Sequence, residues 1–319
     1  MSVPVVALGG GHGLAASLAA LRRVTDTLTA IVTVADDGGS SGRLRAELGA
    51  VPPGDLRMAL ATLAGDDEDG RQWAQVFQHR FAGSGSLAGH PVGNLILTGL
   101  AEVLGSPVAA LDAAGRLLGA AGRVLPLSIE PLDILAEVSG LDADYPGTLT
   151  EVRGQVAVAT TPGQVVALRL VPPHPAACKE AVSAIHDAAV VVLGPGSWFT
   201  SVLPHLLVPD VAAALATTSA RVVVTLNLAP QPGETAGFSP ENHLEVLAAH
   251  APELVVDVVL ADSATVLDTR GLMSAAEALG ADLVLAPVAA GDGTPRHDPA
   301  RLAAAYADVL GRLADGAAR

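Results

Sequence analysis

Three glycine-rich loops, each placed directly after an apolar run, constrain the fold of this chain more than any other feature. They are GGGHG at residues 9–13, DDGGSSG at residues 36–42 and GPGS at residues 194–197. The runs before them carry no charged residue and are rich in valine and alanine, which is typical of buried parallel strands: residues 3–8, 29–35 and 189–193. Because the carboxyl ends of parallel strands lie along one edge of a sheet, the loops predict a single shared cleft.

The remaining sequence keeps alternating between helix and strand. Helical spacing is found at residues 14–23, 54–63, 71–81, 92–104, 108–118, 178–187 and 299–313, and strand-like runs at residues 123–127, 222–226, 255–260 and 283–287. This pattern predicts an α/β, Rossmann-like doubly wound fold with a mainly parallel sheet.

Residues 149–160 and 164–171 interrupt that rhythm. Both alternate between apolar and polar residues around Thr161-Pro162-Gly163, which predicts an inserted antiparallel hairpin. A chain of 319 residues can bury one large core. We therefore expect a single α/β domain over residues 1–319, with a small subdomain around residues 120–175.

Composition excludes several partners and mechanisms. The formal net charge is −15 and basic residues do not cluster, so no nucleic-acid partner is expected. Lys179 is the only lysine and follows no G-x-x-x-x-G, which excludes a P-loop NTPase. Cys178 is the only cysteine, which excludes an intrachain disulfide and fits a cytoplasmic protein.

Residues 188–209 contain no Asp, Glu, Lys or Arg and have the length of a membrane span. The GPGS break and the polar Thr200-Ser201 pair within this segment predict a strand, a loop and a helix instead. We therefore expect no membrane insertion. The N-terminal run has no basic flank, so it is interpreted as a first strand and not as a signal peptide.

The first loop is a candidate phosphate site. Gly11, Gly13 and Ala16 fit the relaxed dinucleotide fingerprint G-x-G-x-x-A. Backbone N–H groups of Gly10 to Gly13 at a helix start would suit an anion. The alternative is that these glycines only permit close contact between strand and helix. His12 could contact a phosphate or simply be exposed.

The second loop supplies acids and hydroxyls. Asp36 and Asp37 stand where a Rossmann acid binds a ribose, and either carboxylate could hold Mg²⁺ together with phosphate oxygens. Adjacent strand residues point to opposite faces, so we expect one of the two to face the cleft. Ser40, Ser41 and Arg45 add donors beside them. The alternative is a loop in which an aspartate caps the following helix.

Further candidates follow other predicted strands or begin helices. Asp55 could face the cleft or be a plain N-cap, and the amide of Asn94 could bind a base or sugar. Arg296 could close on a diphosphate, although Asp298 as a plain N-cap accounts for that segment equally well. The remaining candidates come from the third loop and the segment after the strand at residues 222–226: Gly194, Gly196, Ser197, Thr200, Asn227 and Gln231. The third loop lacks the second glycine of G-x-S-x-G, which excludes a serine hydrolase.

Together these segments resemble the gluconeogenesis factor (YvcK-like) family, which is related to the CofD-like 2-phospho-lactate transferase superfamily. The matching segments stand in the family's order: GGGHGLA, VADDGGSSGRLR, PPGDLRMAL, GHPVGNLIL, GPGSWFTSVLPHLL, NLAPQPGET and RHD. The resemblance implies a Rossmann-like fold, binding of UDP-N-acetylglucosamine or UDP-glucose, and a cytoplasmic role that links carbon metabolism to cell-wall supply and cell shape. It also implies a protein partner in cell-wall synthesis. The transferase relatives imply Mg²⁺ and a guanine-nucleotide-linked phospholactate.

This sequence departs from the family pattern in three places. His12 stands where a threonine is usual, Ala229-Pro230 replace Met-Thr, and Pro299 follows RHD where relatives carry a phosphorylatable threonine. The glycines and the acids are retained.

Three functions are consistent with these residues. The first is a UDP-sugar-binding regulatory protein without assigned catalytic residues. The second is a Mg²⁺-dependent phosphotransferase of the 2-phospho-lactate transferase type, in which Asp36 or Asp37 holds the metal. The third is an NAD-binding oxidoreductase, which rests on the fingerprint alone. The alanine- and leucine-rich terminal helix could form a homodimer face or cover the core.

Overall fold

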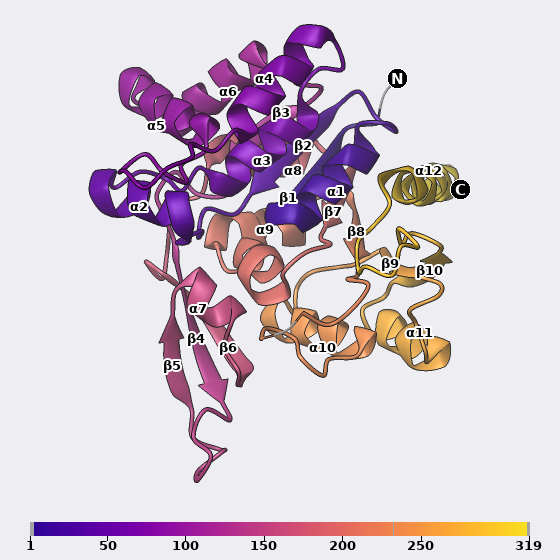
Figure 1. Cartoon of the computed structure of the whole chain (residues 1–319). Helices are drawn as coiled ribbons and strands as arrows, with labels where there is room; N and C mark the ends of the chain where they lie inside the picture. Colours follow the sequence, from indigo (N-terminus) through magenta and orange to yellow (C-terminus); the bar gives the residue numbers. More distant parts are fainter. Residues whose placement is uncertain (1–2, 232, 318–319) are drawn as a thin grey trace.

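A computed structural model describes residues 3–231 and 233–317, and it is an α/β fold built on a parallel sheet (Figure 1). The sheet has seven strands in the order β10-β9-β8-β7-β1-β2-β3, and every neighbouring pair is parallel. The strands are β1 (Val5–Gly9), β2 (Leu28–Val32), β3 (Arg123–Pro126), β7 (Val190–Leu193), β8 (Arg221–Thr225), β9 (Val258–Asp262) and β10 (Asp282–Ala286). The predicted fold class is confirmed.

Helices cover both faces of this sheet. On one face α1 (Gly11–Leu21) contacts both α3 (Gly54–Leu63) and α12 (Pro299–Ala317). Two further contacting pairs cover the other face, α8 (Lys179–Asp187) with α9 (Pro209–Thr217) and α10 (Pro240–His250) with α11 (Thr269–Ala278); α9, α10 and α11 lie in the connections between β7 and β10. The other helices are α2 (Gly39–Leu48), α4 (Glu68–Gln78), α5 (Val92–Leu104), α6 (Pro107–Leu117), the π-helix η1 (Trp198–Val202) and the 3₁₀-helix η2 (Leu203–Leu206).

Strands β1 and β7 are buried at every position, because helices cover them on both sides. The core around them is made of valine, leucine, alanine and isoleucine with few aromatic rings. The connections leave β1 toward β2 in one direction and β7 toward β8 in the other. The strand order therefore reverses between β1 and β7, which is where open α/β sheets bind ligands.

The inserted antiparallel element is present, but its pairing differs from the expected hairpin. β5 (Thr150–Arg153) and β6 (Gln164–Val171) do not pair with each other; they lie on opposite sides of β4 (Asp133–Ser139). Residues 155–159, expected as part of a strand, form the short helix α7 (Gln155–Ala159). The small sheet extends away from the main one (Figure 1). The sequence prediction failed because β4 pairs with two segments, whereas the turn signal suggested that they pair with each other.

Two element boundaries also differ from the predicted ones. β2 ends at Val32, so Asp36 and Asp37 follow it on an extended loop, and α1 begins at Gly11, inside the glycine turn. Within the described part of the chain, no single helix is long and apolar enough to cross a membrane; Trp198–Leu206 and Pro209–Thr217 reach that measure only as a pair, bent by 73°.

Candidate functional site

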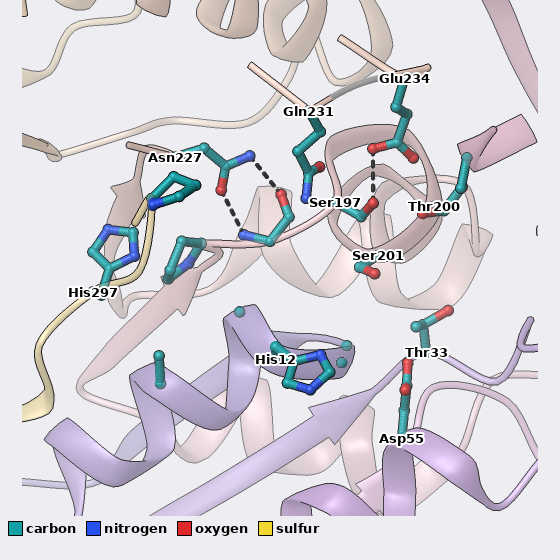
Figure 2. Close-up of a pocket in the computed structure, with 18 of the residues that line it drawn as sticks. His12, Thr33, Asp55, Ser197, Thr200, Ser201, Asn227, Gln231, Glu234 and His297 are labelled. Carbon is teal, nitrogen blue, oxygen red and sulfur yellow. Dashed lines mark hydrogen bonds between the residues drawn. The ribbon is translucent and has the colours of Figure 1, made fainter. Parts of the chain in front are cut away.

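A cleft of about 780 Å³ opens at the carboxyl ends of β1, β2, β7 and β8. All three glycine-rich loops contribute to it, as the parallel arrangement of their strands predicted. Of the sequence-predicted residues, twelve line the cleft: Gly10, Gly11, His12, Gly13, Asp36, Asp55, Gly196, Ser197, Thr200, Asn227, Gln231 and Arg296. Figure 2 shows the cleft between His12, Thr33 and Asp55 on one side and Ser197, Gln231 and Glu234 on the other.

Glycine is required where α1 meets the β7 turn. A Cβ at Gly13 would lie 2.3 Å from the Pro195 carbonyl oxygen and 2.4 Å from Cα of Gly196, both backbone atoms. A Cβ at Gly10 would lie 2.6 Å from the Thr33 methyl group and 2.7 Å from the Asp55 carboxylate. The close approach of three segments at this point therefore explains the glycine-rich sequence.

The start of α1 has no side-chain cap on its N-cap residue, Gly10. The first helical hydrogen bond runs from Leu14 N–H to the Gly10 carbonyl, so the N–H groups of the preceding helical residues have no carbonyl within the helix. The N–H of Gly11 stabilises the charged Asp55 carboxylate. The N–H groups of His12 and Gly13 are the donors that this helix start offers to an anion.

Two carboxylates, Asp36 and Asp55, line the cleft beside this helix start. Burial raises the pKa of Asp55 to about 7, and the charge of Asp36 adds to that shift, while the Gly11 N–H opposes it. Asp37 does not line the cleft: its Oδ1 accepts a hydrogen bond from the N–H of Val156 in α7, at 3.0 Å. One of the two adjacent acids faces the cleft, as expected. The choice of Asp37 as a metal ligand is therefore not supported, and Asp55 takes its place next to Asp36.

The turn that follows β7 forms its hydrogen bonds with other residues of the protein. The Asn227 amide accepts from the Gly196 N–H at 2.8 Å and donates to the Gly196 carbonyl at 2.7 Å, as Figure 2 shows. The Ser197 hydroxyl donates to Oε2 of Glu234 at 2.8 Å. Gly194 lies outside the lining, with φ of +74° and no room for a Cβ beside the Thr225 carbonyl. Asn227, Gly196 and Ser197 therefore line the cleft with partners inside the protein, and their binding of a ligand stays a prediction.

Five polar residues of the cleft were not among the predicted site residues: Thr33, Gln155, Ser201, Glu234 and His297. Glu234 is 3% exposed, and burial raises its pKa, an effect that the Ser197 hydrogen bond partly offsets. Burial lowers the pKa of His297 to about 4, so its ring is neutral at pH 7. Glu234 stands in the quoted segment NLAPQPGET, and His297 directly follows Arg296, so their positions after strands were the available signal. Pro232, in the same segment, lies outside the described residues.

Ser40, in the first turn of α2, and Asn94, in the first turn of α5, are buried and do not line the cleft. The Asn94 amide accepts from Nε of Arg57 at 2.9 Å and donates to the Ser40 hydroxyl at 2.9 Å, which lies 2.7 Å from Nδ1 of His90. These four side chains form one buried polar chain. Asn94 lies outside the cleft lining and uses its amide to connect Arg57 and Ser40, so the structure gives no support to the prediction that it binds a base or sugar.

Ser41 and Arg45 also have internal partners. The Ser41 hydroxyl accepts from the Gly54 N–H at 3.0 Å, which fixes the start of α3. Arg45 pairs with Asp133 at 2.7 Å and so ties α2 to the antiparallel sheet. Neither Ser41 nor Arg45 lines the cleft. The structure therefore does not support the prediction that they donate hydrogen bonds to a ligand.

Arg296 lines the cleft, but its side chain already forms an ion pair. Its guanidinium pairs with Asp292 at 2.7 Å, and its side chain is 72% exposed. The cleft therefore holds three carboxylates, from Asp36, Asp55 and Glu234, against one exposed arginine. In the part of the chain that the structure describes, no group of three or more His, Cys, Asp or Glu could hold a metal ion.

The fold and the cleft can now be compared with known proteins. The sequence profile described as "2-phospho-L-lactate transferase CofD" matches residues 5–284. The chain belongs to the CofD family. The match covers the whole parallel sheet through most of β10 and every loop of the cleft except that of Arg296 and His297.

Several named proteins are similar to this chain over most of their length. A protein from Mycobacterium tuberculosis named "Putative gluconeogenesis factor" is 59% identical over 315 residues, which cover 98% of this chain and 92% of that protein. A "Gluconeogenesis factor" from Halalkalibacterium halodurans is 38% identical over 83% of this chain and 79% of its own. The crystal structure of a UPF0052 family member from Bacillus halodurans has a TM-score of 0.85 and 34% identity, covering 96% of this chain and 98% of that one.

Proposed function

We propose that this CofD-family protein binds a UDP-sugar, UDP-N-acetylglucosamine or UDP-glucose, and acts as a regulatory protein. The observation that carries the proposal is the cleft at the reversal of strand order, where a glycine turn at the start of α1 lies beside Asp36 and Asp55. Open N–H groups at a helix start suit a diphosphate. A volume of about 780 Å³ is in the range of small-molecule sites.

Mg²⁺ would be needed for tight binding. A diphosphate brought next to Asp36, Asp55 and Glu234 meets carboxylates and no free lysine or arginine. Mg²⁺ usually takes one or two carboxylates together with phosphate oxygens, and the two neighbouring acids Asp36 and Asp55 fit that donor set. Burial and, next to it, the charge of Asp36 raise the pKa of Asp55, and a bound cation would favour its ionised form. When bound, the ion would neutralise charge on the diphosphate.

The regulatory role rests on the relatives that carry the name gluconeogenesis factor. Under this proposal, the protein reports UDP-sugar supply to a protein partner in cell-wall synthesis, in the cytoplasm. It would thereby link carbon metabolism to cell-wall supply and cell shape.

A second function, transfer of a phosphate-linked group, is favoured by the CofD profile and by the Asp36–Asp55 pair. It predicts that a guanine-nucleotide-linked phospholactate and a deazaflavin acceptor react on this protein in the presence of Mg²⁺. Product formation in that assay would favour the transferase over the regulatory protein.

Isothermal titration calorimetry of the full chain tests the proposed function. UDP-N-acetylglucosamine, UDP-glucose, GDP and NAD are titrated with and without Mg²⁺. The proposal predicts binding of a UDP-sugar that Mg²⁺ strengthens. Binding of NAD alone would support the oxidoreductase instead, and binding of GDP alone would support the transferase.

A matched pair of variants tests the metal ligands. Asp36→Asn should weaken Mg²⁺-dependent binding by about tenfold or more, because it removes one carboxylate from the cation. Asp37→Asn changes the neighbouring acid, which faces α7, and should leave affinity near the wild-type value. Equal effects of the two substitutions would remove the assignment of Asp36.

A further inference from the structure

Unpaired polar atoms cluster in the cleft. Over the described residues, eight buried side-chain nitrogen or oxygen atoms have no hydrogen-bond partner. Five of the eight belong to residues that line the cleft: Thr33, Thr200, Gln231, Glu234 and His297. Buried polar groups in folded proteins are nearly always paired, so such a concentration indicates a ligand that supplies the missing partners.

The chemistry of these atoms defines what that ligand must present. Oε1 of Gln231 is a hydrogen-bond acceptor only. Nε2 of His297 has no hydrogen-bond partner, and burial keeps the ring neutral at pH 7, so one of the two ring nitrogens is an acceptor. Thr200 is near enough to favour the ionised form of Glu234, yet neither Thr200 Oγ1 nor Glu234 Oε1 completes a hydrogen bond. Oε1 of Gln231 and Oε1 of Glu234 therefore call for donors from the ligand, whereas the hydroxyls of Thr33 and Thr200 can donate or accept.

Three of these residues lie apart from the anion site. Gln231 and Glu234 come from the loop after β8, and His297 from the segment before α12, whereas Thr33 lies with His12 and Asp55 on the opposite side (Figure 2). An acceptor-rich side that contains a carboxylate repels phosphate oxygens. It is suited to hydroxyl groups, each of which can donate to such an acceptor.

We propose that Gln231, Glu234 and His297 form a polyol-recognition wall that accepts hydrogen bonds from the hydroxyl groups of the ligand. The wall deepens the proposed function and rests on it, because it assigns one end of the UDP-sugar to this side and the diphosphate to the other. The polyol is either the hexose or the ribose of that ligand. Both present the same chemistry, and the experiment separates them.

The chain offers a matched pair of glutamines for the test. Gln231→Met removes the buried unpaired acceptor and keeps the length of the side chain. Gln155→Met makes the same change at another residue of the cleft lining, on α7, whose amide is not among the buried unpaired groups. Calorimetry with Mg²⁺ compares UDP-N-acetylglucosamine, UDP-glucose and UDP on the wild type and both variants.

Gln231→Met should weaken binding of a UDP-sugar by about tenfold, and Gln155→Met by less than about twofold. If UDP binds Gln231→Met as it binds the wild type, the hexose lies on the wall. If UDP is weakened as much as the UDP-sugar, the ribose lies there. Wild-type affinity of Gln231→Met for all three ligands would overturn the proposal.

Failure of the proposed function gives a different result. A wild-type protein that binds neither UDP nor a UDP-sugar contradicts that function, and thermal-shift measurements with free N-acetylglucosamine and glucose then decide about the wall. A sugar that raises the melting temperature of the wild type and of Gln155→Met, but not of Gln231→Met, keeps the polyol wall. The absence of any such stabilisation overturns it.

Discussion

Two polar regions, one behind the cleft and one in its lining, use similar residues in opposite ways. The α2 side, defined by Ser40, Ser41 and Asn94, consumes its hydrogen bonds within the protein. The polyol-recognition wall leaves acceptors on Gln231, Glu234 and His297 without partners. Both are built from polar segments that follow a strand or begin a helix. The two regions differ in how many of their polar atoms have partners within the protein, although Nη1 of Arg57 in the α2 region also has none.

The buried charge of Arg57 explains why the α2 side forms its hydrogen bonds within the protein. Arg57 is 3% exposed, and burial lowers its pKa to about 10, so its charge needs fixed partners. The Asn94 carbonyl supplies one of them, and Asp55 and Asp36 favour its charged form. The buried chain from His90 to Arg57 thereby supports the loop that carries Asp36. The polyol-recognition wall contains no buried cation. Its unpaired acceptor atoms can therefore accept hydrogen bonds from a ligand.

The largest expected effect comes from breaking the α2 side. Asn94→Leu removes the acceptor of the buried Arg57 Nε and the donor to Ser40, and should lower the free energy of unfolding by about 3 kcal/mol. Urea denaturation measures this loss, and calorimetry at low temperature measures ligand affinity of the folded protein. A variant of full stability that no longer binds the UDP-sugar would make Asn94 a ligand contact and end the distinction between the two sides.

A somewhat smaller effect on the free energy of unfolding is expected from His205, a buried residue of the core. His205 is fully buried, its Nε2 lies 3.1 Å from the Ile31 carbonyl oxygen of β2, and burial lowers its pKa to about 4. Between that value and the ordinary pKa of 6.5, the unfolded chain binds a proton that the folded chain does not, so acid destabilises the protein. Asp55 and Glu234, with raised pKa values, act in the opposite direction.

The contribution of His205 is therefore measured against His205→Gln, which retains a donor but does not titrate. From pH 7.5 to pH 5, the wild type should lose about 2 kcal/mol more free energy of unfolding than the variant. Urea denaturation at the two pH values provides the comparison. Parallel losses would mean that His205 is protonated in the folded protein.

The smallest effect comes from two buried hydroxyls: Ser41 in the α2 side, which has a partner, and Thr33 in the cleft lining, which has none. Ser41→Ala leaves the Gly54 N–H without its acceptor and should cost about 1 kcal/mol. Thr33→Val removes a hydroxyl that has no partner and should be neutral or slightly stabilising in the ligand-free protein. Thermal denaturation distinguishes the two. Equal destabilisation would indicate that Thr33 is satisfied and would weaken the count of unpaired atoms.

The sequence predicted what depends on strand geometry. Gly13 and Asp36 were assigned correctly to the cleft because parallel strands bring their carboxyl ends to one edge. It failed for Asn94 and Ser40, whose partners are separated by 54 residues and become visible only after folding. Glu234 and His297 were missed because a buried acid or a neutral histidine in a loop carries no periodic signal. The third strand of the antiparallel sheet, β4, was missed for the same long-range reason.

A crystal structure of the full chain with UDP-N-acetylglucosamine and Mg²⁺ is the most direct test of the central claim. It should show the diphosphate at the N–H groups of His12 and Gly13, the cation between it and the carboxylates of Asp36 and Asp55, and ligand hydroxyls on Gln231 and His297. A ligand bound elsewhere on the sheet, or one that leaves both the start of α1 and the polyol-recognition wall empty, would contradict it.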